Sequence, residues 1–210
     1  MKKAILILAL FGFVAGNALA TAQDTPPDVL AKSTSEEVLA VLRANKDIRS
    51  DPKRVTELVE AKVLPNFDFT KMTRLAVGKG WRQASPEQQQ TLVTEFRNLL
   101  VRTYGSSLTQ YKNETVEFKP LKVDPTATDV TVKSQINRAA GGQPIAVDYS
   151  MEKSAAGWKV YDVSIEGVSL VTTYRGSFAD EVQRSGIDGL IASLQQKNRD
   201  AGSGGATSGK

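Results

Sequence analysis

The strongest hydrophobic pattern in the chain lies between Leu64 and Tyr104, and its second half predicts a helix. Ser85 is a suitable N-cap, Pro86 suits the first helical position and Gln88 completes a capping box. Apolar residues then recur at helical spacing along one side, at Leu92, Phe96, Leu99, Leu100 and Tyr104. The segment before this helix is also rich in aromatic and aliphatic residues, so the whole stretch is expected to contribute to the apolar interior.

Two shorter helices are predicted before this stretch. Ser33 or Thr34 can cap the first, because each is followed three residues later by a glutamate. Asp51 and Pro52 mark the start of the second, which carries apolar residues at helical spacing. Residues 28–110 are therefore expected to be mainly helical.

The period of the pattern changes to two after residue 115, which is typical of β-strands. Four runs alternate apolar with polar residues, over 116–118, 130–136, 145–152 and 159–165. In the last run the alternation passes through Lys159, Tyr161, Val163 and Ile165. Because short turn signals separate the runs, residues 115–166 predict an antiparallel meander with one apolar face.

The C-terminal region returns to helical spacing. One helix is expected from about Val168, with a break at Ser185 and Gly186, and a second from there to about Asn198, so that 168–198 is helical. Residues 199–210 are rich in glycine and serine and are expected to be disordered. The elements together predict an α+β fold, a curved antiparallel sheet of four to five strands packed against helices. This arrangement resembles the cone of the nuclear transport factor 2-like folds.

The N-terminus has the features of a cleavable secretory signal over residues 1–20. Two lysines precede the apolar segment 4–15, which is shorter than the roughly 20 residues of a spanning helix, and Ala18-Leu19-Ala20 is a small-x-small cleavage site. Residues 21–27 are expected to form a flexible leader before a single domain over 28–198. The chain has no cysteine, which excludes a disulfide framework and a lipidated cysteine. A soluble exported protein of the periplasm is therefore expected.

The composition excludes several kinds of chemistry. Without histidine or cysteine the chain has no Ser-His or Cys-His nucleophile, and no dense carboxylate cluster suggests a metal site. The net charge of +4 includes two signal lysines and is too mild to indicate nucleic-acid binding. One enzymatic route remains, an aspartate with a tyrosine, because Asp148 precedes Tyr149 and Tyr161 precedes Asp162. Neighbours in a strand face opposite sides, however, so inward tyrosines would leave both aspartates outside.

Two long stretches resemble the MlaC family of periplasmic phospholipid-binding proteins, also called the toluene-tolerance auxiliary component of a lipid ABC transport system. The first contains LPNFDF, TRLAVGKGWRQASPEQQQ and FRNLLVRTY, and the second contains GWKVYDVSIEGVSLVTTYRGSFADEV and GIDGLIASL. Together they span most of the mature chain. The resemblance implies an N-terminal helical lobe, no catalytic activity and no cofactor apart from phospholipid carried as cargo.

The resemblance also implies a cavity between sheet and helices that holds acyl chains, with the lipid head group at its mouth. Residue types alone favour a solid core, and periodicity cannot distinguish a filled core from a lined cavity. The residues expected to contact the acyl chains are Phe69, Met72, Leu75, Trp81, Phe96, Leu99, Leu100, Tyr104, Val147, Tyr149, Met151, Tyr161, Val163, Ile165, Val171, Tyr174 and Phe178. The basic residues proposed for the head group are Arg74, Lys79, Arg82 and Arg175.

The function implied by this family is carriage of phospholipid across the periplasm. The implied partners are an outer-membrane lipoprotein–porin complex and an inner-membrane ABC transporter with a hexameric lipid-binding subunit, and the implied role is maintenance of outer-membrane lipid asymmetry. The carrier is expected to be a monomer. Two alternatives remain open from the residues alone, an enzyme of the cone-shaped fold that acts on a small hydrophobic substrate, and an adaptor without ligand whose apolar faces are fully packed.

Overall fold

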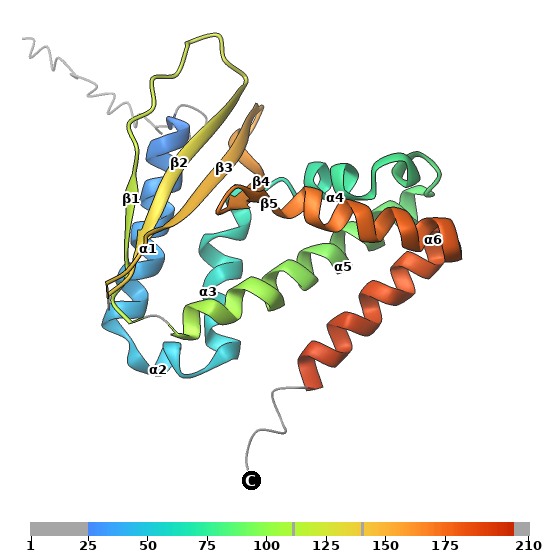
Figure 1. The fold of residues 1–210 in the computed structure, drawn as a ribbon, viewed down its shortest axis with the longest axis horizontal. Helices are drawn as coiled ribbons and strands as arrows, with labels where there is room; N and C mark the ends of the chain where they lie inside the picture. The colour runs from blue at the N-terminus through green and yellow to red at the C-terminus, as the bar shows by residue number, and fades with distance from the viewer. Residues whose placement is uncertain (1–24, 111, 140, 204–210) are drawn as a thin grey trace, which may run out of the picture.

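The computed structural model describes residues 25–110, 112–139 and 141–203 (Figure 1). The predicted signal peptide, residues 21–24 of the predicted leader and residues 204–210 of the predicted tail lie outside this range. An antiparallel sheet occupies one side of the molecule, and the long helices α5 and α6 extend away from it on the other side (Figure 1). The described residues thus form an α+β fold, as the sequence predicts.

The first helix begins earlier than its predicted cap. Helix α1 runs from Pro27 to Ala44, with Pro27 at its first position. The prediction that Ser33 or Thr34 caps it is wrong, because both residues lie within the helix, where the Ser33 hydroxyl donates to the Leu30 carbonyl at 3.1 Å. A serine followed by a glutamate three residues later also occurs inside helices, and here the proline decides the start.

The start of α3 follows its predicted signal. The short helix α2 spans Lys46–Arg49, and α3 spans Pro52–Lys62. Asp51 caps α3, since its carboxylate accepts from the backbone N–H of Lys53 at 2.9 Å. The turn η2 (Leu64–Asn66) then leads to α4 (Phe69–Val77) and to η3 (Gly78–Arg82).

Helix α5 spans Pro86–Gly105 and is followed by η4 (Ser106–Gln110). Its predicted capping box is confirmed. The Ser85 N–H donates to the side-chain oxygen of Gln88 at 2.9 Å, and the Gln88 N–H donates to the Ser85 hydroxyl at 3.2 Å. The box satisfies two backbone N–H groups that would otherwise lack a partner at the start of the helix, so it defines where α5 starts.

The sheet contains five strands in the order of the chain, all antiparallel. They are listed by their bounds as β1 (Thr115–Phe118), β2 (Asp129–Asn137), β3 (Ile145–Ser154), β4 (Gly157–Ile165) and β5 (Val168–Ser169). Four of them follow the predicted runs, and β5 is the short fifth strand that the predicted range of four to five allows. Val132 on β2 pairs with Tyr149 on β3, and both face inward toward the helices.

A bulge changes the phase of β4 relative to the sequence prediction. Met151 pairs with Val160, whereas Tyr149 pairs with Val163, so β4 has one residue more than β3 over this interval. Trp158 and Val160 are therefore buried under the sheet, and Tyr161 lies in the bulge. The predicted alternation through Lys159 and Tyr161 is wrong for this reason, although it holds for the residues after the bulge.

Helix α6 spans Leu170–Ser203 and begins after β5, slightly later than predicted. Gly186 interrupts it with φ 70° and ψ −172°, a conformation that favours glycine, and the chain turns back there (Figure 1). The predicted break at this glycine is confirmed. The second half continues to Ser203, so the helix extends into the segment predicted to be disordered.

Candidate functional site

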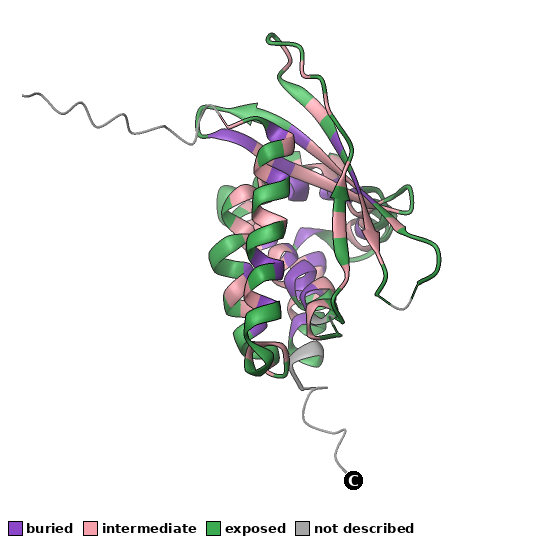
Figure 2. Cartoon of the chain, turned by 90° about the vertical axis from the view of Figure 1, so that its left-hand side faces the viewer, coloured by how far each residue is buried: buried purple, intermediate pink, exposed green. Residues whose placement is uncertain are grey.

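A large apolar cavity lies between the inner face of the sheet and the helices of the N-terminal half. Its volume is about 820 Å³, within the range of about 300–1,000 Å³ that is usual for ligand pockets. Helices α1, α3, α4 and α5 and strands β1 to β4 all contribute residues to its wall. Figure 2 shows that the outer face of the helices beside the sheet is exposed, while buried residues lie on the side toward the interior.

The residues that leave room for this cavity are mostly small or aliphatic. Helix α1 contributes Ala31, and α5 contributes Val101 and Gly105. A Cβ atom built on Gly105 would have only the Val101 side chain, at 4.0 Å, as a neighbour. Because Gly105 is buried and lines the cavity, that open space belongs to the cavity itself.

Tyr149 is one of two tyrosines in the mainly apolar wall of the cavity. Burial raises the pKa of Tyr149 above its usual value, and the nearby hydroxyls of Ser134 and Ser35 offset part of that shift. Its ring stacks on that of Phe118, with 6.2 Å between the ring centroids. Tyr149 stays neutral at physiological pH, so the interior of the cavity carries no charge from this group.

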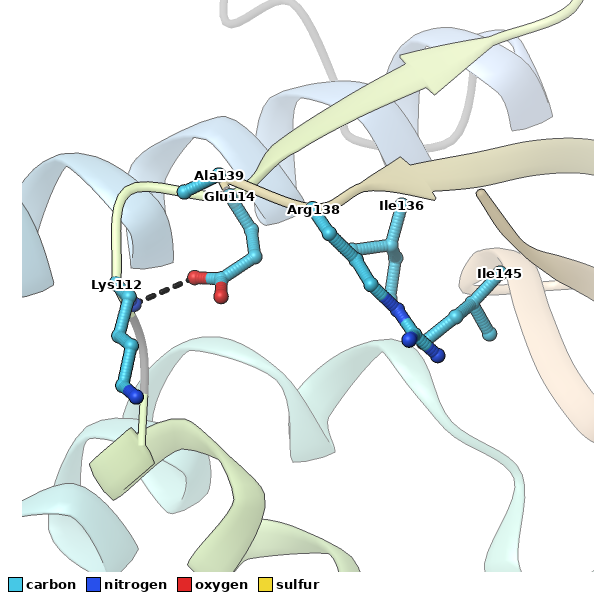
Figure 3. Close-up of a pocket in the computed structure, with 6 residues that line it drawn as sticks. All are labelled: Lys112, Glu114, Ile136, Arg138, Ala139 and Ile145. Atoms are coloured by element: carbon cyan, nitrogen blue, oxygen red, sulfur yellow. Dashed lines mark hydrogen bonds between the residues drawn. The ribbon is translucent and has the colours of Figure 1, made fainter. Parts of the chain in front are cut away.

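The mouth of the cavity is charged. A second hollow of about 530 Å³ adjoins it and shares four of its lining residues, which are Lys112, Glu114, Ile136 and Arg138. In Figure 3 the Arg138 side chain extends past Ile136 toward Ile145, while Lys112 and Glu114 lie across from it. The Glu114 carboxylate accepts from the Lys112 backbone N–H at 2.5 Å. Charged groups thus gather where the apolar wall meets solvent.

Nine of the residues predicted to contact acyl chains line the cavity. They are Phe69, Met72, Leu100, Tyr104, Val147, Tyr149, Met151, Val163 and Ile165. The other eight are not part of its lining. These are Leu75, Trp81, Phe96, Leu99, Tyr161, Val171, Tyr174 and Phe178. Contact between any of these side chains and a lipid stays a prediction.

Most of the second group packs in a solid core between α4, α5 and α6. Phe96 is fully buried there, and its ring meets those of Tyr174 and Phe178 edge to face at 5.0 and 5.2 Å between centroids. Such aromatic contacts fill space efficiently and are individually favourable. One helix stripe therefore has two environments, because the beginning of α5 lies in this core while Leu100 and Tyr104 reach the cavity.

The family comparison agrees with this architecture. A family model described as MlaC protein matches residues 32–196. This chain belongs to the MlaC family. It is 31% identical over 173 residues to the toluene tolerance protein Ttg2D of Pseudomonas putida, covering 81% of this chain and 79% of that protein. It is 26% identical over 176 residues to the intermembrane phospholipid transport system binding protein MlaC of Haemophilus influenzae, covering 82% of each.

A solved structure of the same kind matches the fold. The phospholipid-binding protein from Ralstonia solanacearum, determined in complex with a phospholipid, superimposes with a TM-score of 0.79 and is 39% identical in sequence. The match covers 85% of this chain and 99% of the Ralstonia chain. The arrangement of sheet and helices described above is therefore shared by a phospholipid-binding protein determined in complex with a phospholipid.

The four basic residues that the sequence suggested for the head group do not line this cavity. Arg74 is on α4, Lys79 and Arg82 are on η3 and Arg175 is on α6, and all four are exposed and outside the cavity lining. They are close in sequence to aromatic residues that belong to the solid core rather than to the cavity. A contact between any of them and a lipid head group stays a prediction.

The alternating pattern of β2 contains a signal for one of the charged residues at the mouth of the cavity. Arg138 continues the inward alternation of Val132, Ser134 and Ile136, one step beyond the end of β2. Extending the strand pattern by two residues would have identified it. Leu30 and Ala31 of α1 were missed because they precede the predicted start of that helix, whereas Val38 and Leu39 lie within the predicted helix and also line the cavity.

The two aspartates considered for catalysis, Asp148 and Asp162, lie outside the cavity wall. Asp148 pairs with Lys133 across the sheet, on the face opposite to Tyr149. Asp162 accepts hydrogen bonds from the Ser169 hydroxyl at 2.5 Å and from the Val171 N–H at 3.1 Å, and so it holds the start of α6. Neither aspartate lines the cavity.

The described residues, 25–110, 112–139 and 141–203, contain no group of three or more His, Cys, Asp or Glu residues placed to hold a metal ion. No helix among them has the length and apolar character needed to cross a membrane.

Proposed function

We propose that this MlaC-family protein binds a phospholipid by its acyl chains in the cavity and carries it through the periplasm. The observation that carries the proposal is the 820 Å³ apolar cavity, which occurs in a fold shared with a protein determined in complex with a phospholipid. The names of the relatives, a phospholipid transport system binding protein and a toluene tolerance protein, support the same function.

The wall of the cavity has the chemistry that such a ligand needs. Each methylene group moved from water into an apolar site contributes about 0.8 kcal/mol, so acyl chains can supply most of the affinity without polar recognition. Val147, Met151 and Leu100 are buried side chains of this wall, which would keep the chains away from water. A phosphate kept at the mouth avoids the high desolvation penalty of burying a charge.

The transport steps follow from the family rather than from a contact in this chain. In this proposal the exported protein exchanges lipid with an outer-membrane lipoprotein–porin complex and with an inner-membrane ABC transporter bearing a hexameric lipid-binding subunit. Such exchange maintains the lipid asymmetry of the outer membrane. The protein itself catalyses no reaction, since binding and release are sufficient for a carrier.

The decisive experiment is native mass spectrometry on protein isolated from the periplasm without detergent, followed by organic extraction and lipid analysis. A stoichiometric adduct with the mass of a phospholipid is the expected result. A bare protein mass that stays unchanged after incubation with phospholipid vesicles would overturn the proposal and favour an adaptor without ligand.

A cavity-filling variant tests whether the lipid occupies this cavity. Gly105→Phe places a ring in the open space beside Val101, so loss of the lipid adduct is expected while the fold is retained. Gly176→Phe is the matched control, because Gly176 is also a helical glycine but is exposed on α6, where a built Cβ has no neighbour within 4 Å. Normal lipid loading of Gly105→Phe would show that the ligand binds elsewhere.

A further inference from the structure

The charged mouth of the cavity contains a cation that has no partner within the described part of the chain. The Arg138 side chain makes no hydrogen bond or ion pair among the residues described, and it is exposed at the end of β2. The same holds for the Lys112 ammonium group on the facing segment. Surface arginines are often unpaired, but these two cations line the same hollow, which opens into an apolar cavity.

The strand register explains why Glu114 and Arg138 face the same hollow, to which Lys112 contributes from the segment just before β1. Thr115 pairs with Asn137, so the next residues along the two strands, Glu114 and Arg138, follow on the inward face. Val116 and Ile136 form the preceding inward pair and belong to the cavity wall. The inward face of the sheet therefore changes from apolar to charged within one step of the alternation.

The charges at this mouth fit a group with one negative charge. Lys112 and Arg138 contribute two positive charges and Glu114 contributes one negative charge, which leaves a net charge of +1. The Glu114 carboxylate also holds the backbone of Lys112 through its 2.5 Å hydrogen bond. A guanidinium and an ammonium group on either side of an opening can each donate to phosphate oxygens.

We propose that Arg138 and Lys112 bind the phosphodiester of the lipid whose acyl chains occupy the cavity. This inference rests on the proposed function and adds to it the residues that recognise the phosphate. The pair would orient the lipid with its chains inward and its variable head group toward solvent. Because the phosphodiester is common to diacyl phospholipids, the site would accept different head groups and would discriminate against lipids without phosphate.

The experiment compares two soluble short-chain probes by isothermal titration calorimetry on delipidated full-length mature protein. Dioctanoyl-phosphatidylglycerol carries the phosphodiester, and dioctanoylglycerol has the same chains without it. Arg138→Gln is expected to weaken binding of the first probe about fivefold, a typical size for an exposed charge pair, and to leave binding of the second unchanged. Arg138→Lys, which keeps the charge, should recover part of the affinity, and Lys112→Gln should resemble Arg138→Gln.

The controls separate the failure of this inference from the failure of the proposed function. Arg54→Gln and Lys133→Gln remove an exposed cation on α3 and on the outer face of β2, and both should bind the two probes as the wild type does. If Arg138→Gln weakens both probes equally or neither, the phosphate assignment is overturned while lipid binding stands. If the wild type binds neither probe, the proposed function fails as well.

A separate titration with inorganic phosphate distinguishes a lipid site from a site for the free anion. The wild type is expected to show no saturable binding of phosphate at concentrations where it binds the phospholipid probe. Saturable binding of inorganic phosphate that Arg138→Gln abolishes would overturn the assignment to lipid and identify a free-phosphate site instead.

Discussion

The two ends of helix α5 lie in environments that differ more than their sequences suggest. The first half of the helix belongs to what we call the packed half, the core formed with α4 and α6 around Phe96 and Leu92. The second half, with Leu100 and Tyr104, packs on the same core and in addition borders the hollow half, the cavity under the sheet. A continuous apolar stripe can thus serve as core at one end and as a binding wall at the other.

The difference arises from the elements that face the stripe. In the packed half α6 doubles back at Gly186, so both of its arms can place aromatic and aliphatic side chains against α5. In the hollow half the facing elements are a sheet and a separate helix, and small residues such as Ala31 and Gly105 line the space between them. The comparison shows that the partner surface decides whether an apolar stripe is covered by protein or remains available to a ligand.

Matched truncations should give the largest contrast between the two halves. Leu92→Ala, at a fully buried position in the packed half, is expected to lower the free energy of unfolding by about 3 kcal/mol. Leu39→Ala, at the cavity wall, should cost less than about 1.5 kcal/mol in delipidated protein, because part of that side chain already faces the cavity. Urea denaturation measures both values, and equal losses would contradict the distinction between the halves.

Ligand binding should stabilise the protein and reduce this contrast. A phospholipid at about 100 times its dissociation constant is expected to raise the free energy of unfolding by about 2.7 kcal/mol. With lipid bound, Leu39→Ala should lose about 1 kcal/mol more than it does without lipid, because the side chain then has an apolar contact to lose. The loss caused by Leu92→Ala should be the same in both states, and a lipid-dependent change there would argue against the assignment of Leu92 to the packed half.

The connection between the halves can be tested at Asp162. Its carboxylate accepts from Ser169 and Val171 and so ties β4 to the start of α6. Asp162→Ala is expected to lower the free energy of unfolding by about 1–2 kcal/mol, as for the loss of a helix cap. Asp148→Ala, on the outer face of the neighbouring strand, should change it by less than about 0.5 kcal/mol, and thermal or urea unfolding of the pair provides the comparison.

The smallest expected effect is a pH dependence at the same junction. Lys71 of α4 lies over the Tyr161 ring at 3.5 Å from its centroid and pairs with Glu152 at 3.0 Å. Burial, together with the hydrogen bond to Asp129, raises the pKa of Tyr161 to about 12. The unfolded value is about 10, so the folded state resists ionisation of this group.

The sign of the pH effect follows from these two values. Stability associated with the neutral Tyr161 is fully present below about pH 10 and is lost as the pH rises through about 12. Tyr161→Phe should remain folded at neutral pH and show a shallower loss of stability above pH 10. In the wild type, the absorbance of tyrosinate should rise in a step near pH 12, and this step should be missing in Tyr161→Phe. The same titration curve for both proteins would contradict the assignment of this pKa to Tyr161.

The sequence alone determined most of the local structure and the family. The capping box at Ser85, the cap at Asp51 and the break at Gly186 are local signals that depend only on nearby residues, and all three hold in the structure. Four of the five strands follow from alternation. The family follows from long stretches of similar sequence, and it implied a cavity that composition could not distinguish from a solid core.

Only the tertiary structure decided which side chains border the cavity. The β4 bulge moves Tyr161 out of the inward phase, because one extra residue reverses the alternation that precedes it. The return of α6 at Gly186 covers Phe96, Tyr174 and Phe178 with protein. The basic residues at the mouth come from segments that meet through strand pairing, and such pairing is set by register across the sheet rather than by distance along the chain.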